Sequence, residues 1–454
     1  MMRPSDARTP RTVEETGMPF LFLAELLQKV LCQRGQLRLP ELAAHVKLGS
    51  AVLDPMIAFL RQEKLCEVTR RGGSGTDADI VCQLTESGRQ RALACLARNA
   101  YAGPCPVPLA AYNAQVAAQS VADMQVTRSA MQVGFADVVV DPRVLEQLGA
   151  AMNSGRAMFI HGAAGSGKTY LAERLACLLP GSIAVPHAIM VDGEVLPFHD
   201  PLLHVPVAAA RPPVQGALEK GAPLDARWER GLHRPAVLVG GELTLDMLDL
   251  RFDAASRLYR VPPHLKANNG IFIIDDLGRQ RCSPMELMNR WIVPMDRAVD
   301  HLSLHNGHAF QVPFDVVVVF SSNFLPERLS DAAFLRRLGY KIEVPALGLA
   351  QYEQVFRQAC VQHGVAFDAG AFAYLVERCH QAGQVPLLAC YPRDLLRQVC
   401  DLARYEGTVA RLDEQVLDWA WNNYFAGAGQ RPAAATAVRA RRDPHATRTL
   451  EETR

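Results

Sequence analysis

The chain has 454 residues, of which 49% are hydrophobic, 21% charged and 7% aromatic. These proportions are those of a globular protein and exclude a wholly disordered or collagen-like chain, while the length suggests about three folding units. Lys and Arg number 48 against 47 Asp and Glu, so the net charge of +1 excludes a bulk electrostatic attraction to nucleic acid or acidic membranes.

We expect neither a membrane anchor nor a secretion signal. The strongest apolar run, Val316–Phe320, is far shorter than the about 18 residues of a transmembrane helix. Residues 1–17 are polar, lack the apolar core of a signal peptide and are predicted to be mobile. The 11 cysteines are scattered without a C-x-x-C pair, which favours reduced thiols. A cytoplasmic protein with no membrane insertion is therefore expected.

Residues 18–100 change their hydrophobic period partway along. Apolar residues recur at helical spacing up to residue 60, and after that apolar and polar residues alternate in two segments that a glycine-rich turn separates. The predicted elements are helices at 18–32, 40–46 and 51–60, strands at 65–69 and 80–84, and a helix after Thr85. This order, together with the phrase LTESGRQRA, resembles the winged-helix domain.

Winged helices bind DNA or protein, and the charges here favour protein. Residues 50–65 contain the helix that would enter a DNA groove, and their only basic residues are Arg61 and Lys64, set against Asp54 and Glu63. It also lacks the set of Arg, Lys, Asn and Gln side chains that reads base edges. Arg70 and Arg71 on the turn leave DNA open as the alternative partner.

Proline and small residues mark the remaining boundaries outside the central part of the chain. Three prolines within Tyr101–Pro108 predict an extended connector, which begins a linker with a helix over 101–139. Residues 426–454 are rich in Ala, Arg and Gly without an apolar period, so a disordered tail is predicted there.

The clearest motif is a complete G-x-x-x-x-G-K-[ST] loop between a buried strand, Ala157–His161, and a helix from Tyr170. Its residues are Gly162, Ala163, Ala164, Gly165, Ser166, Gly167, Lys168 and Thr169. Glycines allow backbone N–H groups to cradle phosphates, and the helix start adds partial positive charge. We predict that Lys168 binds the phosphates of ATP and that the Thr169 hydroxyl binds Mg²⁺.

Two further buried strands end in polar residues that suit this chemistry. Ile271–Ile274 is followed by Asp275 and Asp276, which we assign to the metal and to a general base that polarises water. Asp315–Phe320 leads into Ser-Ser-Asn323, and Leu335-Arg-Arg-Leu338 precedes a strand at 340–344.

From about residue 140 to 425 this order resembles the AAA+ ATPase family. The resemblance implies an α/β core with a parallel sheet at 140–345, and it makes Asn323 the sensor 1 residue. It also implies a homo-oligomer, a hexameric ring, in which Arg336 or Arg337 is the finger that reaches a neighbour's γ-phosphate. The chemistry agrees, because an amide orients water and a guanidinium supplied in trans neutralises developing charge.

After Pro345 only helical spacing follows, and the resemblance makes 346–425 a four-helix lid. Pro392 suits a first helical turn, and Arg393 stands where the family has its sensor 2 arginine, which contacts nucleotide phosphate. A capping or surface role is the competing interpretation for Arg393.

Two features depart from the family. The acidic pair is Asp-Asp instead of Asp-Glu, so Asp276 should stand about one bond length further from the water and turnover should be slow. Lys168 and Asp275 are 107 residues apart, which predicts a long insertion after the second strand that includes Pro235–Leu243. Within it, Glu242 is interpreted as part of a turn before a helix.

The leading hypothesis is an oligomeric Mg²⁺-dependent ATPase, similar to the MoxR-like and chaperone-type branch, that remodels an unknown protein client. An ATP-gated DNA-binding regulator or loader is the alternative from the binding class. A slow or non-hydrolysing nucleotide switch is the third, and it is suggested by Asp276.

Overall fold

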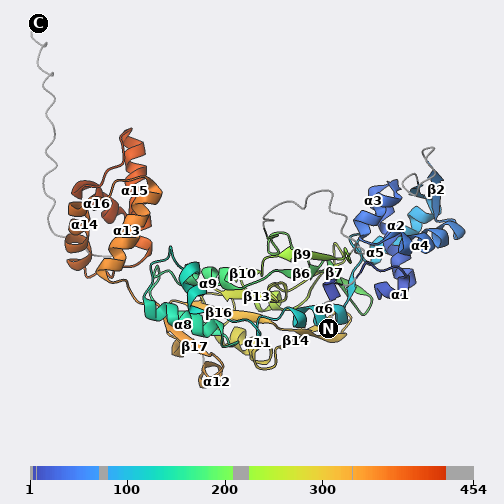
Figure 1. Ribbon diagram of the computed structural model, residues 1–454, viewed down its shortest axis with the longest axis horizontal. Coiled ribbons are helices and arrows are strands. Elements are labelled where there is room, and N and C mark those ends of the chain that lie inside the picture. The colour runs from blue at the N-terminus through green and yellow to red at the C-terminus, as the bar shows by residue number, and fades with distance from the viewer. Residues whose placement is uncertain (1–3, 7, 71–79, 208–223, 330, 426–454) are drawn as a thin grey trace, which may run out of the picture. The chain divides into compact units, whose positions relative to one another are not determined.

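The structure is a computed structural model that describes residues 4–6, 8–70, 80–207, 224–329 and 331–425 (Figure 1). Contacts divide the chain into two compact units, Met1–Pro345 and Ala346–Arg454, called unit 1 and unit 2 below. The predicted tail at 426–454 lies outside the described residues, as does Arg71 on the turn of the hairpin.

The first part of unit 1 contains the helices and the hairpin that the sequence predicts. Its elements are α2 (Phe20–Arg34), β1 (Leu37–Arg38), α3 (Leu39–Val46), α4 (Ser50–Gln62), β2 (Cys66–Arg70), β3 (Ile80–Leu84) and α5 (Glu86–Arg98). The three strands form an antiparallel sheet in the order β1-β3-β2. Helix α5 begins with a cap in which the Thr85 hydroxyl accepts from Gly88 N–H. Gly88 is required there because a Cβ would meet Leu65 O at 1.9 Å.

The core of unit 1 is a five-stranded parallel sheet in the order β10-β13-β16-β5-β17. The strands are β5 (Met158–His161), β10 (Ala236–Val239), β13 (Gly270–Ile274), β16 (Val316–Ser322) and β17 (Tyr340–Glu343). The α/β fold with a parallel sheet that the sequence predicts is confirmed.

Side chains of the central strands alternate between two apolar cores, as the period of two along a strand requires. One core packs β5, β13, β16 and β17 against α7 (Arg128–Gly134), α8 (Pro142–Met152) and α9 (Lys168–Leu175). The other core holds Phe159, Phe272 and Phe320 against α11 (Pro284–Arg297) and α12 (Ala332–Leu335). Because both faces are covered, these strands are continuous apolar runs in the sequence.

The position of the insertion is a correction. Ala236–Val239, predicted to lie within an insertion after the second strand, is β10, the edge strand that pairs in parallel with β13. The insertion therefore consists of two parts, one before β10 at 176–235 and one after it at 240–269. The sequence indicates an apolar strand before Gly240 and Gly241, but only its pairing with β13 identifies it as part of the core sheet.

The inserted segments are rich in short strands. They are β6 (Ile183–Pro186), β7 (Ala188–Val191), β8 (Glu194–Pro197), β9 (Trp228–Leu232), β11 (Arg251–Asp253) and β12 (Leu258–Arg260). They share an apolar core with α6 (Leu109–Ala118), α10 (Pro263–Lys266) and the hairpin of β14 (Val299–Ser303) and β15 (Ala309–Pro313). Two residues of these segments, Ala188 and Val195, belong instead to the core of the N-terminal helices.

The N-terminus differs from its predicted mobility, and the connector, predicted to be extended, ends in a short strand. Strand β4 (Val107–Pro108), at the end of the proline-rich connector, pairs in parallel with β7. Residues 1–17 include α1 (Val13–Thr16) and the buried Ser5, whose backbone N–H donates to Gln115 Oε1 at 2.9 Å. A residue far along the chain orders both segments, because Arg227 donates to the carbonyls of Thr16 and Pro106 at 2.7 and 3.2 Å.

We expect Arg227→Ala to lower the free energy of unfolding by about 3–5 kcal/mol, because it leaves a buried carboxylate unpaired. The Arg227 and Asp225 side chains are 6% and 4% exposed and form a 2.8 Å ion pair. Thermal unfolding followed by circular dichroism measures the effect. The matched control is Arg260→Ala, since the Arg260–Asp253 pair is largely exposed. Equal melting temperatures for both variants would contradict the buried pair.

Unit 2 is a bundle of helices around its own core. Its elements are α13 (Leu349–His363), α14 (Ala369–Tyr374), a π-helical stretch at Leu375–Gln381, α15 (Cys390–Glu406) and α16 (Glu414–Tyr424). Tyr352 and His380 are buried at its centre and share a 2.9 Å hydrogen bond. The helical C-terminal region predicted from the sequence is therefore present.

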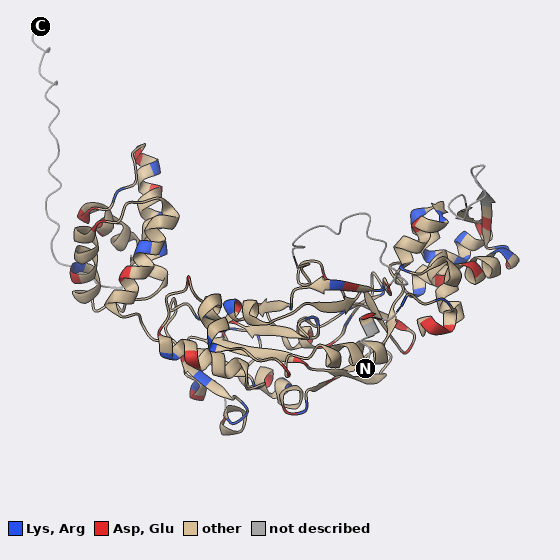
Figure 2. Cartoon of the chain, viewed as in Figure 1, with Lys and Arg blue, Asp and Glu red and all other residues tan. Residues whose placement is uncertain are grey.

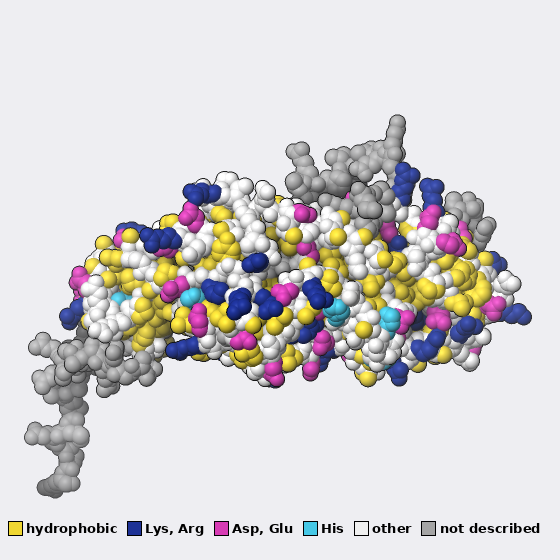
Figure 3. All heavy atoms as spheres, turned by 90° about the horizontal axis from the view of Figure 1, so that it is seen from below, with side chains coloured by type: hydrophobic (Ala, Val, Ile, Leu, Met, Phe, Trp, Pro, Cys, Tyr) yellow, Lys and Arg dark blue, Asp and Glu magenta, His cyan; other side chains and the backbone are white. Residues whose placement is uncertain are grey.

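The surface and the remaining elements agree with the composition. On the face shown in Figure 3, Lys and Arg side chains are interspersed with Asp and Glu, in keeping with the net charge of +1. All eleven cysteines lie in described segments, where each is a free thiol. Within the described residues no single helix has the length and apolarity to cross a membrane, although one pair bent by 111°, α3 with α4, meets both criteria together.

Candidate nucleotide-binding site

The predicted phosphate loop joins β5 to α9 at the carboxyl edge of the sheet. Gly167 caps α9 with φ +96°, a left-handed conformation that other residues rarely adopt. At the other end of the loop, a Cβ on Gly162 would meet Val344 O at 2.4 Å. The backbone path of the loop therefore depends on glycine at both ends.

Lys168 lies within this loop. Its ammonium donates to the carbonyls of Gly162 and Ala163 at 3.1 and 2.9 Å and to Asn323 Oδ1 at 2.8 Å. Burial lowers the pKa of Lys168, and the carboxylates of Asp275 and Asp276 partly offset this effect. The cation is held at the loop and is partly shielded from water, as the binding of a phosphate requires.

The acidic strand contributes two carboxylates with different partners. The Thr169 hydroxyl donates to Asp275 Oδ2 at 2.8 Å, and the Asn323 amide donates to Asp276 Oδ1 at 2.7 Å. Asp276 has φ +49°, so its backbone turns sharply away from the strand. A continuous set of contacts thus runs from Lys168 through Asn323 to Asp276.

Parallel pairing explains why these residues meet. β16 lies between β5 and β13, and Ile274 is opposite Phe320 in the register. Residues that follow three neighbouring parallel strands emerge at the same edge of the sheet. The structure therefore brings together Lys168, Thr169, Asp275, Asp276 and Asn323, as the sequence predicts.

The loop fits the phosphates of a nucleotide, and the neighbouring oxygens fit Mg²⁺. Ser166 Oγ is buried and has no hydrogen-bond partner among the described residues, so a polar atom stands ready for a ligand. Thr169 and Asp275 offer the hydroxyl and carboxylate oxygens that Mg²⁺ prefers. In the described segments no cluster of three or more His, Cys, Asp or Glu could hold a metal by itself. Magnesium, when bound, would be held by these two residues together with phosphate and water.

The two candidate finger arginines differ in their contacts. Arg337 forms an ion pair with Asp296 at 2.8 Å and donates to Ala333 O. The Arg336 guanidinium is exposed and makes no hydrogen bond or ion pair with the described part of the chain. Of the two side chains, only that of Arg336 is unengaged among the described residues.

Sequence reasoning missed the contribution of Gln280. Its amide donates to Asp275 O at 2.9 Å and to Gly240 O at 3.4 Å, and it accepts from Gly278 N–H. It thereby fixes the loop after β10 against the end of the acidic strand. No sequence motif marks a glutamine five residues after Asp275, and the sequence places the loop after β10 in the insertion. Glu242, two residues after Gly240 in the loop that follows β10, is exposed, and its side chain accepts a hydrogen bond from Gly240 N–H. This agrees with the predicted turn.

Arg393 belongs to unit 2, where it lies in the first turn of α15. Its side chain is 69% exposed and pairs with Asp394 at 3.2 Å. Its contact with nucleotide stays a prediction.

Comparisons with known proteins give a similarity of fold. A family described as a domain of unknown function (DUF8689) matches residues 348–423, which lie in unit 2. No curated protein matches the chain.

Among solved structures, NtrX from Brucella abortus is 14% identical with a TM-score of 0.37, over 67% of this chain and 56% of NtrX. The RuvB Holliday junction branch migration motor of Thermotoga maritima is 12% identical with a TM-score of 0.35, over 65% of this chain and 73% of RuvB. A chain of the complex between magnesium chelatase subunits BchI and BchD is 17% identical with a TM-score of 0.29, over 66% of this chain and 93% of that chain. The chain spans little more than half of the length of NtrX.

Proposed function

We propose that this protein is a Mg²⁺-dependent ATPase of the AAA+ type that acts as a homo-oligomer. The observation that carries the proposal is the set of contacts at one sheet edge, in which Lys168 meets Asn323, Asn323 meets Asp276, and Thr169 meets Asp275. A cation, a metal-binding pair and a water-orienting pair are the parts that phosphoryl transfer requires.

Each residue would have one task. Lys168 and the loop N–H groups hold the phosphates, while Thr169 and Asp275 hold magnesium. ATP, when bound, supplies the phosphoryl group that is transferred to water. Asn323 keeps one oxygen of Asp276 fixed, so the other oxygen can orient that water and accept its proton. Arg336 of a neighbouring copy would neutralise the charge that develops at the phosphoryl oxygens.

The proposed output is the remodelling of a protein partner in the cytoplasm, by a ring that the family resemblance makes a hexamer. The N-terminal elements would form the winged-helix docking domain. On α4, the exposed residues Ser50, Ala51, Asp54, Pro55 and Ala58 are small or acidic, and only Arg61 and Gln62, at its C-terminal end, belong to the Arg, Lys, Asn and Gln set that reads base edges. We therefore favour a protein over DNA as the partner of this domain. The ATP-gated DNA-binding regulator remains the alternative.

Lys168→Ala should weaken MgATP binding by about 10-fold to 100-fold, because it removes a charge-assisted contact to phosphate worth roughly 1.5–3 kcal/mol. Titration with a fluorescent ATP analogue measures the affinity. The matched control is Lys341→Ala, an exposed lysine on β17. MgATP binding by Lys168→Ala with wild-type affinity would show that the loop is not the nucleotide site.

A further inference from the structure

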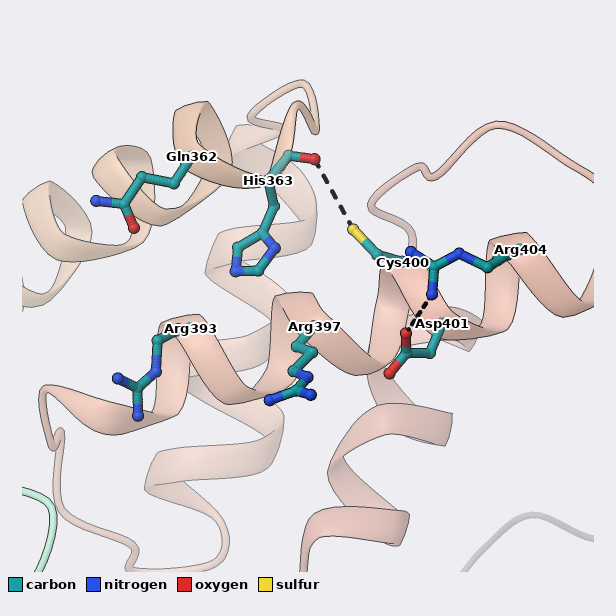
Figure 4. A pocket seen from close by; sticks show the side chains of 7 residues that line it. All are labelled: Gln362, His363, Arg393, Arg397, Cys400, Asp401 and Arg404. Carbon is teal, nitrogen blue, oxygen red and sulfur yellow. Dashed lines mark hydrogen bonds and ion pairs between the residues drawn. The ribbon is translucent and has the colours of Figure 1, made fainter. Parts of the chain in front are cut away.

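Unit 2 contains a cleft of about 490 Å³ between α13 and α15 (Figure 4). It is lined by Gln362, His363, Arg393, Arg397, Cys400, Asp401 and Arg404. Figure 4 shows the side chains of Arg393 and Arg397 on the same side of α15, with His363 opposite them on α13. The wall formed by α15 is thus basic along much of its length.

This concentration of positive charge stands out within the described part of unit 2, residues 346–425. Residues 346–425 contain six arginines and no lysine, against nine aspartates and glutamates. Three of the six arginines line the one cleft, and Figure 2 shows basic residues along α15. Within residues 346–425, which carry a net negative charge, half of the arginines line one cleft, and this favours an anionic ligand there.

The arginines are available to such a ligand. Arg397 is exposed and has no hydrogen-bond or ion-pair partner among the residues that the structure describes. Arg404 pairs with Asp401 at 3.0 Å, but their side chains are 80% and 53% exposed. Exposed pairs between neighbours on one helix are weak, so a ligand carboxylate can replace Asp401 at little cost.

The spacing of the arginines selects an extended ligand. At 1.5 Å per residue along the helix, Arg393 and Arg397 are separated by about 6 Å, and Arg393 and Arg404 by about 16 Å. Alternate side chains of an extended peptide lie about 7 Å apart on one side, which is close to the shorter separation. One small anion cannot reach all three guanidinium groups.

Apolar side chains next to the lining residues favour a peptide over a nucleic acid. Val361 precedes the lining residue Gln362 and is 82% exposed, and Tyr405 follows Arg404 and is 89% exposed. Tyrosine and arginine are the residues that contribute most to protein interfaces. An exposed valine gains nothing from a phosphate backbone, whereas it can pack against an apolar residue of a peptide.

We propose that the cleft between α13 and α15 binds an extended, acidic segment of a partner protein in which carboxylates alternate with apolar side chains. Arg397 and Arg404 would pair with its carboxylates, and Val361 and Tyr405 would pack against the residues between them. Arg397 and Arg404 have no role in the proposed nucleotide site, so their contribution to peptide binding can be measured without nucleotide.

The test uses the full chain without nucleotide and a fluorescein-labelled ten-residue peptide of alternating Glu and Val. Fluorescence anisotropy should show binding that weakens with salt, because the pairs are exposed. The double variant Arg397→Gln/Arg404→Gln should bind at least tenfold more weakly. The control Arg378→Gln, which removes an exposed arginine outside the cleft, should bind within twofold of the wild type.

Two further probes identify the kind of ligand. A peptide with Lys in place of Glu and a ten-nucleotide oligothymidine should both bind at least tenfold more weakly than the acidic peptide. Unchanged binding by the double variant, tighter binding of the oligonucleotide, or no binding of the acidic peptide would each overturn the proposal. Identical circular dichroism melts for variants and wild type exclude unfolding as the cause of weaker binding.

Discussion

Arg336→Ala should reduce ATP turnover by about 10³-fold or more while MgATP affinity stays unchanged. An arginine supplied by a neighbouring copy acts on charge that develops in the transition state and contributes about 10³–10⁵ in rate. Arg336 is exposed and unengaged in the described part of its own chain, so its guanidinium can reach another copy. Steady-state phosphate release over a range of protein concentrations measures the effect, since a shared site requires turnover per subunit to rise with concentration.

The adjacent arginine provides the control for this experiment. Arg337 is engaged by Asp296 and Ala333, so Arg337→Ala should keep turnover within a few-fold of the wild type. Mixing Arg336→Ala with Asp276→Asn subunits should restore activity, because some sites then combine an intact Asp276 with an intact finger. Normal, concentration-independent turnover in Arg336→Ala would rule out a finger acting in trans at this position.

Asp276→Asn should lower turnover by about 10²–10⁴-fold and leave the nucleotide bound, because the amide cannot accept a proton from the attacking water. The Asn323 amide holds one carboxylate oxygen of Asp276 at 2.7 Å, and Lys168 in turn holds Asn323. The measurements are single-turnover hydrolysis and nucleotide retention after gel filtration. The wild type should itself be slow, below the about 10 s⁻¹ typical of enzymes.

Two variants show whether this carboxylate acts at the water. Asp276→Glu should increase turnover, since the added methylene brings the carboxylate closer. Glu242→Gln is the matched control, because Glu242 follows the edge strand β10 next to the acidic strand and is exposed. We expect it to keep wild-type turnover. A large loss in Glu242→Gln with little effect of Asp276→Asn would move the water-orienting role to Glu242.

Most of the site could be predicted from the sequence, because each part is local. The phosphate loop needs its glycines, Lys168 and Thr169 in one short segment. β13 and β16 are covered on both faces, and their burial appears in the sequence as continuous apolar runs before Asp275 and before Asn323. The joint position of these polar residues then follows from parallel pairing alone.

The place of β10 in the core sheet could not be predicted in this way. Its side chains alternate between exposed and buried, it is four residues long, and turn residues flank it on both sides. Many short segments of the chain share this pattern, and what makes this one a core strand is its register with Ile271–Ile274. The association of residues 1–17 with the rest of unit 1 was missed for the same kind of reason. Their buried contacts are to Arg227 and Gln115, more than one hundred residues away.

The sequence by itself determined the parts of the proposed site, which are a phosphate loop, a carboxylate pair and the Asn323 amide, because each part lies in a short segment of consecutive residues. The tertiary structure decided which side chains are engaged and which are available. It pairs Arg337 with Asp296, ties Asp276 to Asn323, and leaves Arg336 and Arg397 without partners among the described residues. These outcomes depend on distances between segments far apart in the chain, which no local pattern encodes.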